Sequence, residues 1–104
     1  MEQISVRKVA AVIVMARELH RAEAEMRALV DRMNEEEQAA LVAVMWIGRG
    51  AFEPEEWQEA FETAYAEAST PTADYLIGTP HLADNLESGL EALGYDVSHE
   101  EDAF

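Results

Sequence analysis

The Gly48-Arg49-Gly50 turn is the feature of the sequence that most suggests ligand chemistry. Backbone N–H groups beside two glycines can approach an anion closely, and the planar guanidinium of Arg49 can bind it through two parallel hydrogen bonds. The turn lacks the Lys-Ser/Thr of a nucleotide-binding loop and the third glycine of a dinucleotide-binding fingerprint. The commoner role of such glycines is to end a helix, with the arginine held by carbonyls or by an acid.

A ligand pocket at this turn would need walls from neighbouring segments. Aromatic side chains around the turn, together with a second turn that contains Gly and Pro, are the available candidates. At helical spacing, however, an aromatic stripe more often belongs to the core. The candidate ligand-binding residues are Trp46, Gly48, Arg49, Gly50, Phe52, Tyr75, Gly78 and Pro80.

Acidic residues form a second candidate surface, because charge is divided unevenly along the chain. Residues 1–49 contain all seven Lys and Arg against eight Asp and Glu, which gives 7 − 8 = −1. Residues 50–104 contain fourteen Asp and Glu and no Lys or Arg, which gives −14. Such a half is ordinarily a solvated surface, but it also suits a basic partner protein or, as a special case, mimicry of a nucleic-acid backbone. The candidate partner surface comprises Glu55, Glu59, Glu62, Asp84, Glu87 and Glu91.

The inventory for catalysis and metal binding is thin. The chain has no Cys, which excludes disulfides and thiolate chemistry, and no Ser lies in a Gly-x-Ser-x-Gly elbow. The strip His81, Asp84, Glu87 and Glu91 falls on one side of a helix, yet the chain has no Glu-x-x-His of the kind that carboxylate-bridged metal bundles use. We therefore expect no catalytic residues, no metal and no cofactor. General acid–base chemistry by two carboxylates stays open, since it requires only the right separation in space.

Length and composition set the class of protein. A chain of 104 residues suits one domain, and 49% hydrophobic with 28% charged residues is an ordinary globular balance. The net charge of −15 disfavours direct binding to nucleic acid or to an anionic membrane. No apolar run approaches the roughly 20 residues of a membrane span, and the first residues lack the basic region of a secretory signal. We expect a cytoplasmic protein.

The first element is expected to be a long helix. Ser5 is a good N-cap, and residues 6–33 contain neither Gly nor Pro. A continuous helix of about 28 residues would be about 42 Å long and would overhang the core that shorter helices can build. It must therefore break near residues 20–23 or project against another copy. The segment 9–16 is largely apolar on every side, which makes it the candidate surface for a homo-oligomer.

The later segments also have helical patterns. Asn34 caps an almost wholly apolar helix that ends at Gly48, which places residues 41–47 at the centre of the fold. The next helix opens at Pro54 and has an aromatic stripe that should face inward. With the alanines on the same face, that stripe comprises Trp57, Phe61, Ala64, Tyr65 and Ala68.

The chain should form one all-α domain over residues 1–95. A short helix over residues 73–77 and a last helix from Pro80 to Gly94 complete it, and no strands pair up. We predict a compact bundle of four or five helices with a long N-terminal helix, in which the third and last helices pack across the central one. Residues 96–104 are acidic and low in apolar residues, which predicts a short flexible tail.

Two segments of the sequence resemble a family of short, acidic bacterial proteins catalogued only as a domain of unknown function. The first is Trp-Ile-Gly-Arg-Gly-Ala-Phe at 46–52, followed by a Pro-Glu-Glu-Trp helix start, and the second is Tyr-Leu-Ile-Gly-Thr-Pro-His-Leu-Ala-Asp-Asn-Leu-Glu-Ser-Gly-Leu at 75–90. With the opening segment, the resemblance covers most of residues 4–94. It implies a small, cytosolic helical domain with no established activity, cofactor or catalytic residues. The sequence differs from the family at Ala51, where members often carry an acid, and at residues 21–33, where many have a longer acidic insert.

These observations favour a non-enzymatic protein-interaction or regulatory module that uses its acidic half. The alternative is a small-ligand or anion-binding pocket at the Gly48-Arg49-Gly50 turn, with or without catalytic activity, and the third is a nucleic-acid mimic. The pocket requires an exposed, unpaired Arg49 in an aromatic-walled concavity. Mimicry requires carboxylates of the third and last helices in a curved row.

Overall fold

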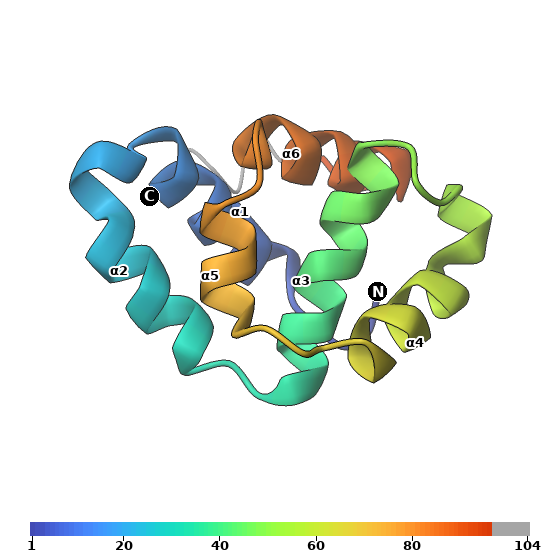
Figure 1. Ribbon diagram of the computed structural model, residues 1–104. Coiled ribbons are helices and arrows are strands. Elements are labelled where there is room, and N and C mark those ends of the chain that lie inside the picture. The colour runs from blue at the N-terminus through green and yellow to red at the C-terminus, as the bar shows by residue number, and fades with distance from the viewer. Residues whose placement is uncertain (97–104) are drawn as a thin grey trace.

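The computed structural model describes residues 1–96, which form six α-helices, one 3-10 helix and no strand (Figure 1). The predicted all-α class is confirmed, whereas the predicted count of four or five helices is too low. Residues 97–104, which make up nearly all of the predicted acidic tail, lie outside the described residues. The helices are α1 (Val6–Arg17), α2 (Leu19–Asp31), α3 (Glu35–Gly48), η1 (Pro54–Glu56), α4 (Trp57–Ala66), α5 (Thr72–Ile77) and α6 (Leu82–Ala92).

The N-terminal segment is not one long helix, because the chain breaks at Glu18 between α1 and α2, just before the predicted break near residues 20–23. Glu18 leaves the helical region with φ −117° and ψ 36°, and its carbonyl accepts the N–H groups of Arg21 and Ala22 that open α2. The break lets α2 turn back against α1, so that Met26 and Val30 are fully buried. The molecule measures 33 × 31 × 22 Å, less than the length of the unbroken helix. Burial of the apolar face of α2 is the physical reason for the break.

Helix α3 lies at the centre of the fold, as predicted from its apolar sequence. In Figure 1 it runs through the middle of the molecule, with α5 on one side, α4 on the other and α6 across the top. The Asn34 side chain accepts the backbone N–H of Glu37, whose carboxylate accepts the N–H of Asn34, so both groups cap the helix start. Every residue from Ala39 to Met45 is buried. A helix that is apolar on all sides can be stable only in such a position.

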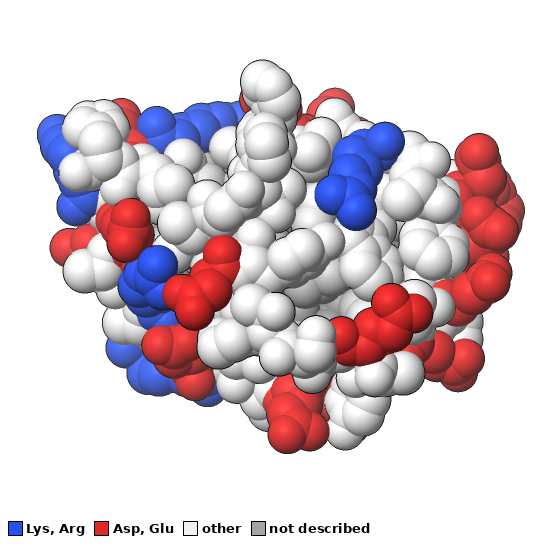
Figure 2. Space-filling view, viewed as in Figure 1, with Lys and Arg blue, Asp and Glu red and all other residues white. Residues whose placement is uncertain are grey.

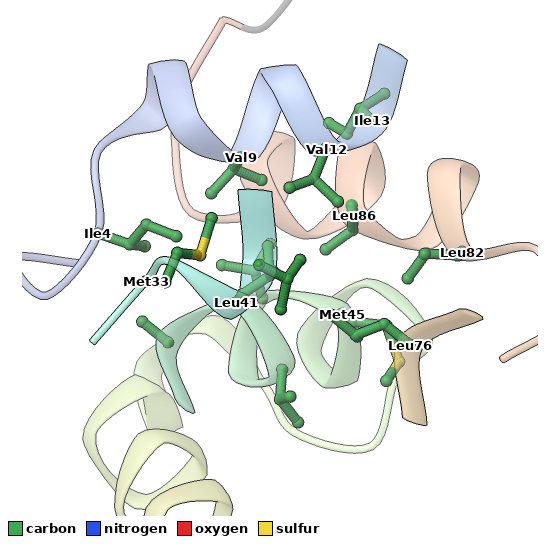
Figure 3. Packing of buried hydrophobic residues seen from close by; sticks show 14 of the residues in the cluster. Ile4, Val9, Val12, Ile13, Met33, Leu41, Met45, Leu76, Leu82 and Leu86 are labelled. Atoms are coloured by element: carbon green, nitrogen blue, oxygen red, sulfur yellow. The ribbon is translucent and has the colours of Figure 1, made fainter. Parts of the chain in front are cut away.

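The core joins α1, α3 and α6. In Figure 3, Val9, Val12 and Ile13 of α1 point toward Leu86 of α6 and Leu41 of α3. All five side chains are fully buried. The rest of the apolar segment, residues 14–16, is half-buried by other parts of the molecule. The apolar surface that suggested self-association through residues 9–16 is therefore largely covered by the fold, and a homo-oligomer stays a prediction without that support.

Helices α3 and α6 touch backbone to backbone. A Cβ added to Gly48 would lie 1.7 Å from the carbonyl oxygen of Asn85, and one added to Gly89 would lie 2.1 Å from the carbonyl oxygen of Val44. Neither position has room for a side chain. This pair of glycines brings the end of α3 against α6 and fixes where the following turn leaves the core.

Candidate functional site

The Gly48-Arg49-Gly50 turn is explained by packing and helix termination. Gly48 packs against α6, as described above, and Gly50 adopts the left-handed conformation with φ 86°. The N–H of Ala51 donates to the carbonyl of Trp46 at 2.9 Å, and the N–H of Gly50 donates to the carbonyl of Ile47 at 3.1 Å. These two hydrogen bonds form the Schellman arrangement at a helix end. Gly50 thus serves the role at a helix end that the commoner interpretation assigned to both glycines, whereas Gly48 is required by packing against α6. Nothing in their geometry requires an anion.

Arg49 fits neither arrangement predicted for it. Its side chain is exposed, and within residues 1–96 its guanidinium has no hydrogen bond or ion pair. It also lines none of the grooves described below. The exposed guanidinium that the pocket hypothesis requires is present, but none of the three grooves of the described chain lies against it.

Three of the predicted ligand residues do meet one another. The indole Nε1–H of Trp46 donates to the Tyr75 hydroxyl at 2.9 Å, and Phe52 stacks on Trp46 with ring centroids 5.8 Å apart. Trp46 and Tyr75 line a groove of about 730 Å³ between α3, the end of α4 and the loop into α5. Gly78 and Pro80 are exposed in the turn that follows α5 and do not line it. The groove therefore lies on the side of Trp46 away from the glycine turn.

Sequence reasoning missed most of the other walls of this groove. Gln38 lies on the same face of α3 as Trp46 and holds the Val30 carbonyl through its amide at 2.8 Å. Thr72, at the start of α5, lies 3.5 Å from the Gln38 amide oxygen. The α3 positions 35, 38, 39, 42 and 46 recur at helical spacing. That periodicity was the available signal, but it cannot show that the loop after α4 closes over this face.

A continuous set of exposed carboxylates runs along η1 and α4; two of them accept hydrogen bonds from uncharged groups, Glu56 from the backbone N–H of Glu53 and Glu62 from the side chain of Gln58. We call this set the acidic edge; it comprises Glu53, Glu55, Glu56, Glu59 and Glu62, all exposed. None of the five pairs with Lys or Arg in the described part of the chain. Figure 2 shows the acidic groups gathered along the side of η1 and α4, whereas the basic groups gather mainly over α1 and α2. For η1 and α4, the division of charge along the sequence is therefore also a division in space.

The predicted partner acids on α6 lie in a different electrostatic setting. The carboxylate of Glu87 accepts a hydrogen bond from Arg17 at 2.7 Å, while Asp84 and Glu91 are exposed. Helix α6 packs against α1, which carries the cations Arg7, Lys8 and Arg17. The six predicted partner acids are thus split between the η1 and α4 segment and α6, and those on α6 are partly neutralised. This division gives no support to a single curved row of carboxylates.

A smaller groove of about 370 Å³ borders the acidic edge. We call it the Tyr65 groove; it is lined by Gln3, Glu36, Phe61, Glu62 and Tyr65. The predicted inward stripe is confirmed for Ala64, which is buried, and for Trp57 and Phe61, which are half-buried. It is wrong for Ala68, which is exposed, and for Tyr65, which is 48% exposed, because both lie where no other element of residues 1–96 covers the end of α4. The Phe61 and Tyr65 rings are 6.2 Å apart. Gln3 and Glu36 carried no sequence signal, because only the fold brings the N-terminal segment and the start of α3 to α4.

Carboxylates surround Tyr65. Its hydroxyl donates a hydrogen bond to Glu35 at 3.2 Å. This bond, and then the negative charges of Glu35 and Glu36, raise the pKa of Tyr65 above its ordinary value. The hydroxyl therefore keeps its proton at neutral pH, and the ring stays neutral within a negative potential.

The structure gives little chemistry beyond these grooves. In residues 1–96, no three His, Asp or Glu side chains converge as they would to hold a metal ion. His81 has a left-handed backbone with φ 57° just before α6, and a third groove of about 300 Å³ lies beside it. None of the helices of the described chain combines the length and apolar character needed to cross a bilayer.

Comparison with known proteins places the chain in a family. The profile of the family described as "Protein of unknown function (DUF3775)" matches residues 23–95, which include both segments that carried the resemblance. The opening segment before residue 23 lies outside the matched range. No curated protein and no solved structure matches the chain significantly. Because the profile covers more than half of the chain, the protein belongs to the DUF3775 family of proteins of unknown function.

Proposed function

We propose that this protein is a non-enzymatic interaction module that binds a basic segment of a partner protein through its acidic edge. The observation that carries the proposal is that the five exposed carboxylates of this edge have no cationic partner within residues 1–96. The sequence supplies no Lys or Arg beyond residue 49 that could neutralise them locally.

The cations of the first half are largely engaged elsewhere. Lys8 pairs with Glu37 between α1 and α3, Arg17 pairs with Glu87 between α1 and α6, and Arg27 pairs with Asp74 between α2 and α5. These contacts join helices to one another. Among the described residues, none of these cations reaches the acidic edge, so its negative charge stays unbalanced.

A surface of this kind favours fast and salt-sensitive association. Uncompensated charge of one sign steers an oppositely charged partner over distances of about a Debye length, which is about 8 Å at physiological ionic strength. Exposed ion pairs add little affinity singly, so recognition requires several carboxylates at once. The spacing of Glu55, Glu59 and Glu62 along one helical face meets this requirement.

The test is a matched pair of variants titrated with one defined probe. A short lysine- and arginine-rich peptide is added to the full chain at low and physiological ionic strength, and binding is followed by fluorescence anisotropy. We expect the variant Glu55→Gln/Glu59→Gln to bind several-fold more weakly than the wild type. The control, Glu25→Gln/Asp31→Asn, makes the same change in net charge at exposed positions of α2. Equal loss in both variants would show attraction to overall charge and would exclude the acidic edge as the binding surface.

A second candidate function is a small-ligand site in the larger groove, which the Trp46–Tyr75 hydrogen bond and the groove volume favour. Its aromatic walls and amide and hydroxyl groups suit a compact aromatic molecule. Ligand-observed NMR with neutral and cationic monocyclic aromatic fragments tests this directly. Binding should be lost in Thr70→Trp, which fills the groove from an exposed loop position. Absence of binding to the wild type, or equal binding to both proteins, would contradict this function.

A further inference from the structure

We propose that the Tyr65 groove receives the guanidinium of an arginine from the basic segment that binds the acidic edge. This inference rests on the proposed function and specifies which side chain of the partner segment the protein recognises. The groove and the edge are continuous, because Glu62 belongs to both. A peptide that lies along α4 would therefore reach both surfaces at once.

The polar walls of the groove offer hydrogen-bond acceptors. Glu36, in the first turn of α3, and Glu62, on α4, line the groove from two elements, and neither pairs with a cation among the described residues. Gln3 lines it from the N-terminal segment, and its side-chain oxygen is buried without a hydrogen-bond donor within residues 1–96. A buried acceptor without a donor costs stability. One oxygen of Glu62 already accepts the side-chain amide of Gln58 at 3.0 Å. The groove therefore offers a guanidinium the carboxylate of Glu36 and the second oxygen of Glu62, from two different helices.

The aromatic walls favour a flat cation. The rings of Phe61 and Tyr65 lie 6.2 Å apart and are tilted by 45°, and a cation is attracted to the negative face of such rings. The Tyr65 hydroxyl donates its proton to Glu35 at 3.2 Å. A phenol that donates in this way carries more electron density on its ring, which strengthens attraction to a cation. The 48% exposure of the Tyr65 side chain leaves part of its surface accessible to a partner.

Arginine fits this combination better than lysine does. A guanidinium is planar and weakly hydrated, so it can stack on a ring while its N–H groups donate to carboxylates at its edge. A lysine ammonium is a compact, strongly hydrated charge, which gains less from stacking. The groove volume of about 370 Å³ is near the lower end of ligand pockets, about 300–1,000 Å³. That size suits one side chain.

The experiment compares two peptides of equal length and charge, one with arginine as its basic residue and one with lysine. Both are titrated into the full chain by fluorescence anisotropy. We expect the wild type to bind the arginine peptide about three- to tenfold more tightly. Tyr65→Leu should bring this ratio of affinities close to one. The variant Glu36→Gln/Glu62→Gln should weaken binding of the arginine peptide more than the control Glu25→Gln/Asp31→Asn does. Tyr65→Phe keeps the ring and loses only the bond to Glu35, so it should retain part of the preference.

Two results would contradict the proposal that the Tyr65 groove binds an arginine side chain. One is equal affinity of the wild type for the two peptides, and the other is a preference for arginine that persists in Tyr65→Leu. Thermal unfolding of each variant verifies that the fold is intact, and Tyr65→Phe provides the second variant if Tyr65→Leu fails to fold. The acidic edge is tested separately. If Glu55→Gln/Glu59→Gln weakens both peptides while Tyr65→Leu changes nothing, the proposed function stands and the arginine groove is rejected. If no acidic variant differs from the control, both are rejected.

Discussion

At the scale of single residues, much of the apparent chemistry of the sequence turns out to be packing. The two glycines around Arg49 differ in role. Gly48 lets the backbone of α6 pack directly against α3, and Gly50 adopts the left-handed conformation that ends α3. Tyr65 shows the reverse, since its helical spacing predicted burial while the structure exposes it. Spacing along one helix shows which residues share a face. Which part of that face another element covers depends on the rest of the fold.

Gly89 gives the sharpest prediction about packing. The Cβ of Gly89→Ala would meet the Val44 carbonyl oxygen at 2.1 Å, and a backbone atom cannot move aside without separating α3 from α6. We expect a loss of about 3 kcal/mol in the free energy of unfolding, in the upper part of the range for overpacked sites. Gly50→Ala, which meets no atom but needs a left-handed backbone, should cost about 1 kcal/mol. Chemical denaturation measures both. A loss in Gly89→Ala no larger than in the exposed control Ser88→Ala would contradict the close crossing.

Glu37 gives a prediction about pH. Its carboxylate accepts hydrogen bonds from Lys8 and from the backbone N–H of Asn34, which lower its pKa below the ordinary value of 4.5. Because the folded state holds the charged form more tightly, this stabilisation is present above about pH 4.5 and is lost as pH falls through the lowered folded-state pKa. Glu37→Gln should cost about 0.5–1 kcal/mol at neutral pH, since solvent screens Lys8. Denaturation should show the difference between the two proteins shrinking in acid. An equal difference at all pH values would contradict this role.

At the scale of elements, the sequence predicted helix starts and ends correctly wherever a capping residue or a glycine marks them. The caps Ser5 and Asn34 and the left-handed Gly50 after α3 act as predicted. The break at Glu18 has no such mark, because it is set by the burial of α2 against the core and not by a Gly or Pro. The candidate site follows the same rule. The sequence named Trp46 and Tyr75 only as aromatic candidates for the walls of one pocket, and their hydrogen bond is a finding of the structure. The Tyr65 groove requires three segments that only the tertiary fold brings together.

Met26 tests the folding back of α2. Its side chain is fully buried, although it would be in solvent on a helix that continued straight from α1. Met26→Ala should therefore cost about 2–5 kcal/mol in the free energy of unfolding. The exposed neighbour Glu25→Ala is the control and should change stability by less than about 0.5 kcal/mol. Equal small effects in the two variants would show that α2 projects away from the core.

At the scale of the whole molecule, the balance of charge should influence stability as well as binding. The net charge of −15 and the unpaired acidic edge produce self-repulsion, which salt screens. Salt also weakens exposed pairs such as that of Arg17 with Glu87, but such pairs contribute little. We therefore expect repulsion to dominate. Raising NaCl from about 0.05 M to about 0.5 M should increase the melting temperature by a few degrees, which corresponds to a gain of about 0.5 kcal/mol or more in the free energy of unfolding. A fall in melting temperature over this range would show that the ion pairs outweigh the repulsion.

The central claim is that a basic partner segment lies along α4, and amide NMR of the isotope-labelled full chain during titration with the arginine peptide tests it most directly. The largest shift changes should fall on residues 53–66, with further changes at Gln3 and Glu36. They should decrease as salt is added, because screening weakens the attraction. Changes concentrated on α6 around Asp84 and Glu91, or in the larger groove at residues 67–75, would contradict the account.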